Sequence, residues 1–258
     1  MTDDIITKQN GTTLWITLNR PEARNALTFS MYEELARICA EMPTDGSIKA
    51  VVIKGAGGKA FAAGTDMTQF RAFETAQDAL DYENEITRVL TEVDKCPLPT
   101  VAAIHGACTG GGASIAAACD IRISSAQLKF GFPIARTLGN CLNAGNLARL
   151  TELIGAGRVR EMIFTARLMG AEEALSAGLV SEVLPDEATL MDRADALAQH
   201  LAGMAPLTLR ATKEAMRRNR EALAVEDSDL ITLCYMSNDF KHGLEAFLAK
   251  SKPDWSGT

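Results

Sequence analysis

The sequence is poor in aromatic residues and has none of the cysteine and histidine patterns that mark common metal and redox sites. Phe, Trp and Tyr make up 5% of the 258 residues, whereas glycine occurs 20 times, so we expect a core of small and aliphatic side chains. No two cysteines have C-x-x-C spacing and no H-E-x-x-H occurs, which argues against a zinc or thioredoxin-type site. We therefore expect no bound metal, and reduced thiols inside a cytoplasmic protein. The cysteines are Cys39, Cys96, Cys108, Cys119, Cys141 and Cys234.

Positive charge and long apolar stretches are also scarce. The formal net charge of −7 argues against a nucleic-acid partner. No apolar run approaches the length of a membrane span, and the first residues lack a basic region followed by an apolar one. We therefore expect no membrane segment and no secretory signal. The apolar fraction of 47% and the charged fraction of 23% are typical of a folded chain and exclude a disordered one.

The hydrophobic pattern predicts an α/β core followed by a helical tail. Strands are predicted over residues 11–19, 50–54, 100–104 and 120–124. Helical spacing separates these runs, so a sheet with crossover connections is expected. We divide the chain into a core at residues 1–200 and a helical region at 201–258. Helices are predicted over residues 28–39, 68–95, 113–118, 147–153, 159–165, 171–175 and 191–201, and from 206 to the end.

Two familiar glycine motifs fit the sequence poorly. Gly55-Ala-Gly-Gly-Lys-Ala60 follows a predicted strand and matches the G-x-G-x-x-A form of the dinucleotide fingerprint. That fingerprint must open a helix directly, whereas Gly64 interrupts any helix here. A phosphate-binding loop would need Ser or Thr after Lys59, where the chain has Ala60.

A serine motif offers a second interpretation. Gly112-Ala-Ser-Ile-Ala116 is close to the G-x-S-x-G nucleophile elbow, and His200 or His242 could complete a triad with Ser114. An elbow serine stands at the tip of a strand, whereas here a glycine loop separates Ser114 from the strand. Serine at a helix start is more often a cap or a packing residue.

Two small-residue turns suggest a different chemistry. One follows Phe61 and ends at Met67, and the other runs from Gly106 to Ala113. Glycine lets backbone N–H groups point outward and lets a ligand approach the main chain. One N–H group from each turn can hold an acyl oxygen and stabilise the negative charge of an enolate or a tetrahedral oxyanion. A helix that begins at the second turn adds its dipole.

Several segments together resemble the crotonase (enoyl-CoA hydratase/isomerase) superfamily. The resemblance covers residues 10 to 256. It rests on Leu18-Asn-Arg-Pro-Glu-Ala-Arg-Asn-Ala-Leu27, Lys59-Ala-Phe-Ala-Ala-Gly-Thr-Asp-Met67, Ala103-Ile-His-Gly-Ala-Cys-Thr-Gly-Gly-Gly112 with Cys119-Asp120, Leu138-Gly-Asn140, Ala144-Gly145, residues 170–183, and Gly243-Leu-Glu-Ala-Phe-Leu-Ala-Lys250.

The resemblance implies an acyl-CoA enzyme, a lyase or isomerase of fatty acid metabolism. It implies a spiral of ββα turns with a C-terminal helical trimerisation region, in a homotrimer or a dimer of trimers. Coenzyme A would be part of the substrate, with no separate cofactor. The backbone N–H groups of Thr65 and Gly111 would form the oxyanion hole. Residues implied for coenzyme A are Ala23, Ala63, Asp66 and Met67, with Phe247 and Lys250 from the C-terminal helix.

The sequence departs from that family where catalytic acids are expected. The two glutamates of hydratases correspond to Ser114 and Ile134, and the acid of many isomerases corresponds to Asn143. Neither Ser114 nor Ile134 can act unaided as a general base at neutral pH, so simple hydration is doubtful. Decarboxylation, thioester hydrolysis at Ser114, isomerisation with an unusual base, and coenzyme A binding without catalysis stay open. The polar residues expected to face the acyl group are Ser114, Arg136, Asn140, Cys141 and Asn143.

Overall fold

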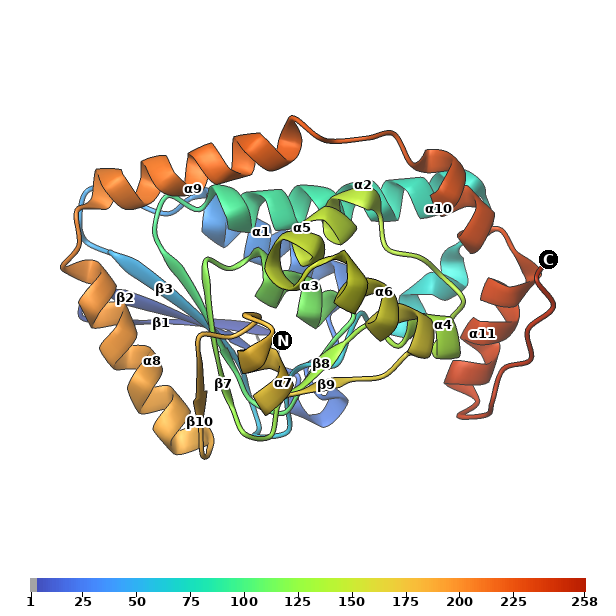
Figure 1. Cartoon of the computed structure of the whole chain (residues 1–258), viewed down its shortest axis with the longest axis horizontal. Helices are drawn as coiled ribbons and strands as arrows, with labels where there is room; N and C mark the ends of the chain where they lie inside the picture. The colour runs from blue at the N-terminus through green and yellow to red at the C-terminus, as the bar shows by residue number, and fades with distance from the viewer. Residues whose placement is uncertain (1–3) are drawn as a thin grey trace.

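The computed structural model describes residues 4–258 and is built on a six-stranded sheet in the order β1-β2-β3-β5-β7-β10 (Figure 1). The β1–β2 pair is an antiparallel hairpin, and the other pairs are parallel. The hydrophobic pattern predicts the second strand of the hairpin, at residues 11–19, but not the first. The strands are β1 Ile5–Asn10, β2 Thr13–Leu18, β3 Ala50–Gly55, β5 Thr100–Ile104, β7 Ile121–Ser125 and β10 Glu182–Leu184.

A second, four-stranded sheet lies at the ends of the long strands and was not predicted. Its strands β4, β6 and β8 pair in parallel, and β9 pairs antiparallel with β8. Each of β3, β5 and β7 turns into one of these short strands and then into a helix, which makes a repeated ββα unit. The strands are β4 Ala60–Ala62, β6 Ala107–Thr109, β8 Lys129–Gly131 and β9 Met169–Gly170.

Helices cover both faces of the six-stranded sheet. Leu190 and Ala194 of α8 pack on Val52 and Val101 of one face, while α1 and α2 belong to the core on the other. The predicted helix at 68–95 is divided into η2 (Met67–Ala72) and α2, which begins after a capping box at Thr75. The α-helices are α1 Phe29–Ala40, α2 Ala76–Lys95, α3 Gly111–Ala118, α4 Ile134–Thr137, α5 Ala144–Ile154, α6 Ala156–Thr165, α7 Ala171–Ser176, α8 Glu187–Ala202, α9 Pro206–Glu221, α10 Ser228–Tyr235 and α11 Asn238–Leu248.

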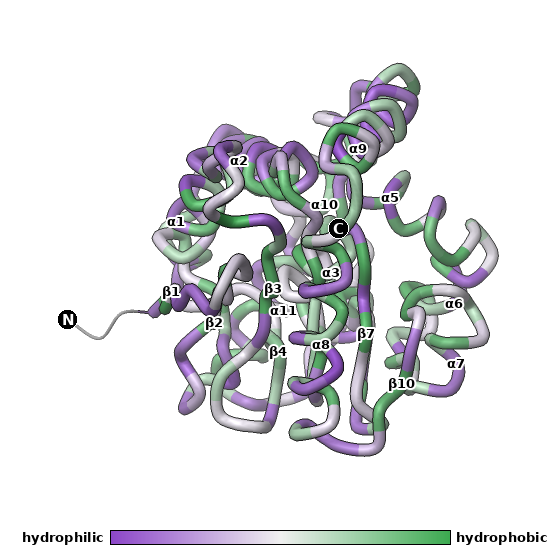
Figure 2. The backbone as a smooth tube through the Cα atoms, turned by 90° about the vertical axis from the view of Figure 1, so that its left-hand side faces the viewer, coloured by the Kyte–Doolittle hydropathy of each residue, from purple (hydrophilic) through white to green (hydrophobic). Residues whose placement is uncertain are grey.

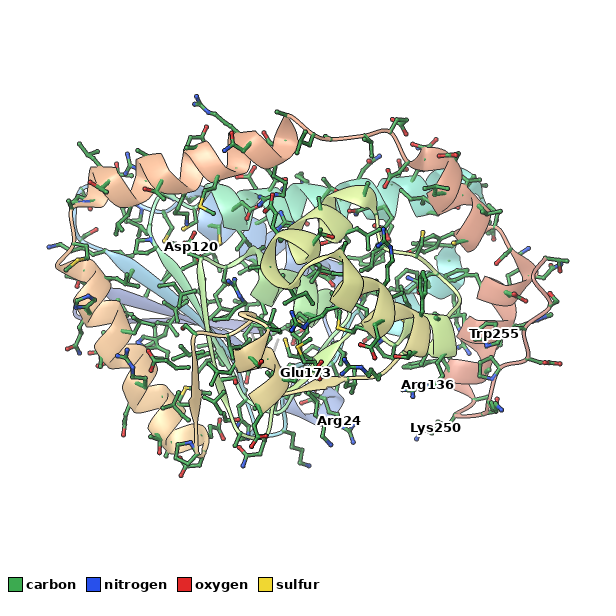
Figure 3. The ribbon with its side chains drawn as sticks, viewed as in Figure 1. Arg24, Asp120, Arg136, Glu173, Lys250 and Trp255 are labelled. Atoms are coloured by element: carbon green, nitrogen blue, oxygen red, sulfur yellow. The ribbon has the colours of Figure 1, made fainter. Side chains whose placement is uncertain are left out.

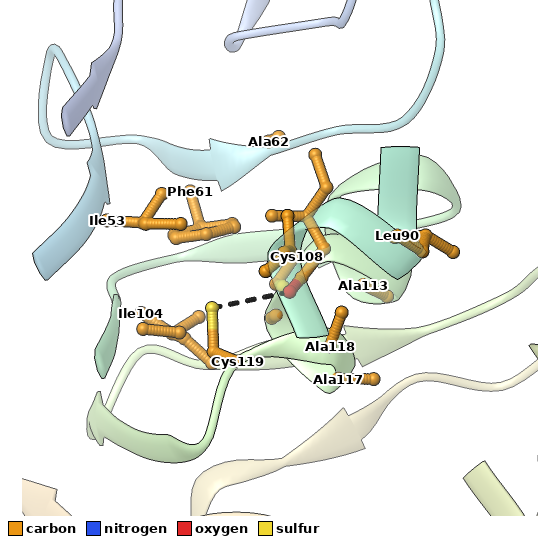
Figure 4. Close-up of a cluster of buried hydrophobic side chains, with 14 of the residues drawn as sticks. Ile53, Phe61, Ala62, Leu90, Ile104, Cys108, Ala113, Ala117, Ala118 and Cys119 are labelled. Carbon is orange, nitrogen blue, oxygen red and sulfur yellow. Dashed lines mark hydrogen bonds between the residues drawn. The ribbon is translucent and has the colours of Figure 1, made fainter. Parts of the chain in front are cut away.

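The small residues of the sequence gather where α3 meets the second sheet (Figure 4). Ala113, Ala117 and Cys108 are buried there. A methyl group on Gly112 would lie 2.4 Å from the carbonyl oxygen of Ala62, so this helix can approach β4 only with glycine at that position. The close packing fixes the start of α3 against the turn that follows β4.

The glycine motif after β3 does not open a helix, as the dinucleotide fingerprint of a Rossmann fold requires. Residues 56–59 form a turn that enters the strand β4. A Cβ atom on Gly55 would lie 2.1 Å from the carbonyl oxygen of Ala60, so the glycine serves this tight reversal. The structure therefore supports the sequence argument against that fingerprint.

The C-terminal helices leave the core and then return to it. The helix α9 has no buried residue and lies along the outside of the molecule (Figures 1 and 2). The helices α10 and α11 return, α10 against α2 and α11 against η2 and α4. None of the helices in residues 4–258 is long and apolar enough to cross a membrane.

Candidate active site

The two small-residue turns predicted from the sequence lie against each other. Gly64 and Gly110 have φ angles of 114° and 51°, which glycine adopts without strain. A Cβ atom on Gly110 would lie 3.4 Å from the Cα atom of Gly64. The turns after β4 and β6 are therefore in van der Waals contact.

The backbone amides of Thr65 and Gly111 follow these glycines. The preceding glycines are hydrogen-bonded within the protein: the Gly64 carbonyl oxygen accepts the N–H of Leu27, and the Gly110 N–H donates to the Gly131 carbonyl oxygen at 3.1 Å. Within residues 4–258, neither the Thr65 amide nor the Gly111 amide donates to a protein acceptor. Gly111 is the first residue of α3, whose dipole favours negative charge at this end.

Both residues line one cavity between the second sheet and the helices α2, α4 and α10. All three tyrosines of the sequence lie in its wall. So do Ser114, Ile134, Asn140 and Cys141, four of the positions singled out in the sequence. The other lining residues are Ala63, Gly64, Met67, Phe70, Glu83, Ile86, Thr109, Gly110, Pro133, Thr137, Leu138, Leu142, Asn146 and Phe247.

A tyrosine explains why residue 111 must be glycine. A Cβ atom there would lie 1.7 Å from the hydroxyl oxygen of Tyr32. That hydroxyl is 2.8 Å from Thr65 Oγ1, which is also 3.1 Å from the hydroxyl of Tyr82. Burial raises the pKa of Tyr32 far above its ordinary value, so the phenol stays neutral. These hydrogen bonds engage the side chain of Thr65, whereas its backbone N–H has no acceptor among residues 4–258.

The positions where the family resemblance places acids carry none. Ser114 is buried in α3 and lines the cavity, and Ile134 presents an apolar side chain. In residues 4–258 the Ser114 hydroxyl has no hydrogen bond to a histidine or a carboxylate that could activate it. Asn143 lies behind the wall, where its side chain caps α5 and donates to a carboxylate.

That carboxylate belongs to Glu83, which was not among the site residues predicted from the sequence. Only 5% of Glu83 is exposed. Tyr235 Oη donates to Glu83 Oε1 at 2.6 Å, and Asn143 Nδ2 donates to Glu83 Oε2 at 2.7 Å. Burial raises the pKa of Glu83 to about 7, although both hydrogen bonds oppose it, and the charge of Asp227 raises it further. Glu83 is thus an acid that titrates near neutral pH.

The sequence held a signal for Glu83. Buried positions of α2 recur at Ala79, Glu83, Ile86 and Leu90, the spacing of an apolar helix stripe. A glutamate on such a stripe is costly to bury and therefore requires a specific explanation.

The residues predicted for coenzyme A are more scattered. Ala63, Met67 and Phe247 line the cavity. Asp66 does not line the cavity; its side chain caps η2 and forms an ion pair with Arg20 at 3.0 Å, so it holds the turn that follows β4.

Ala23 and Lys250 lie outside the cavity wall. Ala23 ends the short helix η1 (Pro21–Ala23), next to Arg24, whose carbonyl oxygen accepts the N–H of Ala63. Lys250 follows α11 on the exposed surface, and Arg136 is exposed on α4 (Figure 3).

Comparisons with family models and with known proteins point to the same family. The family model for enoyl-CoA hydratase/isomerase matches residues 8–258. The short-chain-enoyl-CoA hydratase of Clostridium acetobutylicum is 34% identical over 257 residues, covering 97% of this chain and 96% of that protein. The mitochondrial Delta(3,5)-Delta(2,4)-dienoyl-CoA isomerase of Homo sapiens is 36% identical, covering 87% and 71%.

Structural comparison adds a third kind of reaction. A methylmalonyl-CoA decarboxylase in complex with 2-nitronate-propionyl-CoA superimposes with a TM-score of 0.88 at 25% identity, covering 98% of each chain. Hydratase, isomerase and decarboxylase thus all share this fold. Similarity alone does not choose among their reactions, and the side chains in the cavity must be considered.

Proposed function

The chain belongs to the enoyl-CoA hydratase/isomerase family of acyl-CoA-processing enzymes, and we propose that it stabilises a thioester enolate at the backbone amides of Thr65 and Gly111. One observation carries the proposal: two amides without a protein acceptor, from two touching turns, lie in the wall of one cavity. Such fixed donors are effective because they need no reorganisation when charge develops on the acyl oxygen.

The pantetheine and adenine parts of coenzyme A would lie along the edge of the same cavity. We assign them to Ala63 and Met67, which line it, and to Ala23 and Asp66 on the adjoining segments. Phe247 lines the cavity from α11, and Lys250 provides a positive charge just beyond that helix. Coenzyme A thus enters as part of the substrate.

The side chains favour enolate chemistry over hydration. Adding water by the two-glutamate route needs one carboxyl to hold the water and another to protonate carbon. Of the residues lining the cavity in the described chain, Glu83 alone carries a carboxyl. We therefore place the enzyme among those that form and reprotonate an enolate.

Acetoacetyl-CoA tests this proposal, because stabilising its enolate raises a near-ultraviolet absorbance. We expect the absorbance to grow and saturate with added protein, and unmodified coenzyme A to reverse it. A coenzyme A-binding protein without an oxyanion hole would bind the ligand with no enolate signal. A serine thioesterase would release free thiol and take up a fluorophosphonate at Ser114. Either result, or no binding, would refute the proposal.

We also propose that residues 201–258 mediate assembly into a homotrimer or a dimer of trimers in the cytoplasm. Leu207 and Met216 of α9 are 72% and 63% exposed, which is unusual for large apolar side chains. The region does not serve assembly alone, because its Tyr235 and Phe247 line the cavity. Light scattering coupled to gel filtration would give the mass, and a monomer would contradict the assembly.

A further inference from the structure

We propose that Glu83 carries protons to and from the acyl chain, with Tyr235 as the residue that positions it. The proposal rests on the function proposed above, since it takes an acyl-CoA to occupy the cavity. It names the group that moves protons and, through it, the class of reaction.

Glu83 lies close to the two oxyanion donors. Glu83 lines the cavity that also contains the Thr65 and Gly111 amides. The preceding residue on α2, Tyr82, is hydrogen-bonded to Thr65 Oγ1 at 3.1 Å. The helix that carries the carboxyl is therefore tied directly to the turn that carries one of the oxyanion donors.

The hydrogen bonds around Glu83 can accommodate both of its protonation states. When the carboxylate is ionised, Tyr235 donates to it and Asn140 Nδ2 donates to Tyr235 Oη at 3.2 Å. The Oδ1 atom of Asn140 is then buried without a partner among residues 4–258. A half-turn of that amide would let Tyr235 donate to Asn140 Oδ1 and accept the proton of a neutral Glu83. Reversing the chain of donors costs one side-chain rotation.

In the described surroundings of Glu83 there is no compensating cation. The groups around Glu83 are the phenols of Tyr235, Tyr82 and Tyr32, the amide of Asn143, the thiol of Cys141 and the acid Asp227. A structural buried carboxylate is normally paired with Lys or Arg, because an unpaired buried charge is costly. With neutral hydrogen-bond partners and the negative charge of Asp227 nearby, burial raises the pKa of Glu83 to about 7, which suits a group that must act as base and then as acid.

A single such carboxyl can shift a double bond. With a 3-enoyl thioester, a Glu83 oxygen takes a proton from Cα, and the C–H electron pair enters the dienolate whose oxygen lies at the Thr65 and Gly111 amides. The carboxylic acid then returns its proton to Cγ, and the 2-enoyl thioester forms as the enolate collapses. Every proton and electron pair is retained, so neither water nor an oxidant is consumed. The reaction is an isomerisation.

Glu83→Gln tests the role, with Glu85→Gln as the matched control. Glu85 is on the same helix but pairs with Arg88 at the surface. The substrate is 3-hexenoyl-CoA, followed by the absorbance of the conjugated product. A second readout is deuterium incorporation from D2O into Cα of hexanoyl-CoA, followed by mass spectrometry. We expect E83Q to lose about 10²- to 10⁴-fold in both rates with an unchanged dissociation constant for hexanoyl-CoA, and E85Q to match the wild type.

The outcomes separate this proposal from the one on which it rests. Wild-type protein that neither binds nor exchanges refutes the proposed function. Wild-type exchange that persists in folded E83Q refutes the role of Glu83 and leaves the oxyanion hole standing. If E83Q does not fold, Glu83→Asp keeps the carboxyl and decides the matter: the role requires a reduced rate that still falls at acidic pH. A rate in E83D or in the wild type that is independent of pH around neutrality overturns it.

Discussion

Replacing Glu83 by Gln should make the stability of the protein less dependent on pH. Burial raises the pKa of Glu83 from its ordinary value of 4.5 to about 7 in the folded protein. The folded state therefore binds this proton more tightly than the unfolded state. The resulting stabilisation is complete below about pH 4.5 and is lost as the pH rises through about 7.

The expected size follows from the pKa values. A tenfold change in proton affinity is worth about 1.4 kcal/mol, so the free energy of unfolding should fall by about 3 kcal/mol on this account as the pH rises from about 4.5 to above 7. In E83Q this contribution is absent. The stability of E83Q relative to wild type should therefore increase by about 3 kcal/mol over that interval.

Urea denaturation of both proteins between about pH 4.5 and pH 8 measures this difference. A constant offset is also expected, because a Gln amide can turn only one oxygen toward Tyr235 and Asn143, and losing one hydrogen bond costs about 1 kcal/mol at every pH. The raised pKa is tested by how the difference in unfolding free energy between the two proteins changes with pH, and not by its constant part. Curves that stay parallel from acid to alkaline pH would refute the raised pKa and, with it, the argument that Glu83 exchanges protons near neutrality.

Three further predictions concern other parts of the site. Gly111→Ala should lower the isomerisation rate by about 10²- to 10³-fold, because the new methyl group would clash with Tyr32 and displace an oxyanion donor. The control is Gly157→Ala, which adds a methyl group where no other atom is near and should leave the rate unchanged. Tyr235→Phe removes a donor that lowers the pKa of Glu83, so the acidic limb of the pH–rate profile should move to higher pH, and an unmoved limb would contradict this role. Asn25→Ala should destabilise the fold by about 3 kcal/mol in denaturation experiments, because Asn25 Nδ2 donates to the carbonyl oxygens of Ala56 and Ala60; a loss under about 1 kcal/mol would contradict it.

Hydrophobic periodicity predicted the elements that are long enough to show it. The strands β3, β5 and β7 and the helix α1 were found within one or two residues of their bounds. The strands β4, β6 and β8 have three residues each, too few to express an alternating pattern. Their pairing depends on the turns that follow the longer strands, so the second sheet could not be seen in the sequence.

The main-chain part of the site was easier to find than its side chains. Thr65 and Gly111 lie within glycine-rich segments whose residues are contiguous, so local sequence identifies them. Glu83 and Tyr235 are 152 positions apart and belong to no motif. Only the packing of α10 on α2 brings the phenol to the carboxyl. The apolar stripe of α2 could have marked Glu83 as anomalous, but it could not have identified the residues that hydrogen-bond to it.

Several of the few aromatic residues in the sequence line the cavity. Few are present, yet the three tyrosines and Phe70 surround the point where the acyl group would lie. Neutral aromatic walls lower the local dielectric constant, which strengthens the hold of the two amides on an enolate oxygen and raises the proton affinity of the neighbouring carboxylate. Asn143, where the family resemblance placed an isomerase acid, donates to the carboxylate of Glu83 instead. Helix α2 thus supplies the acid, and Asn143, at the start of α5, supplies a hydrogen-bond donor that orients it.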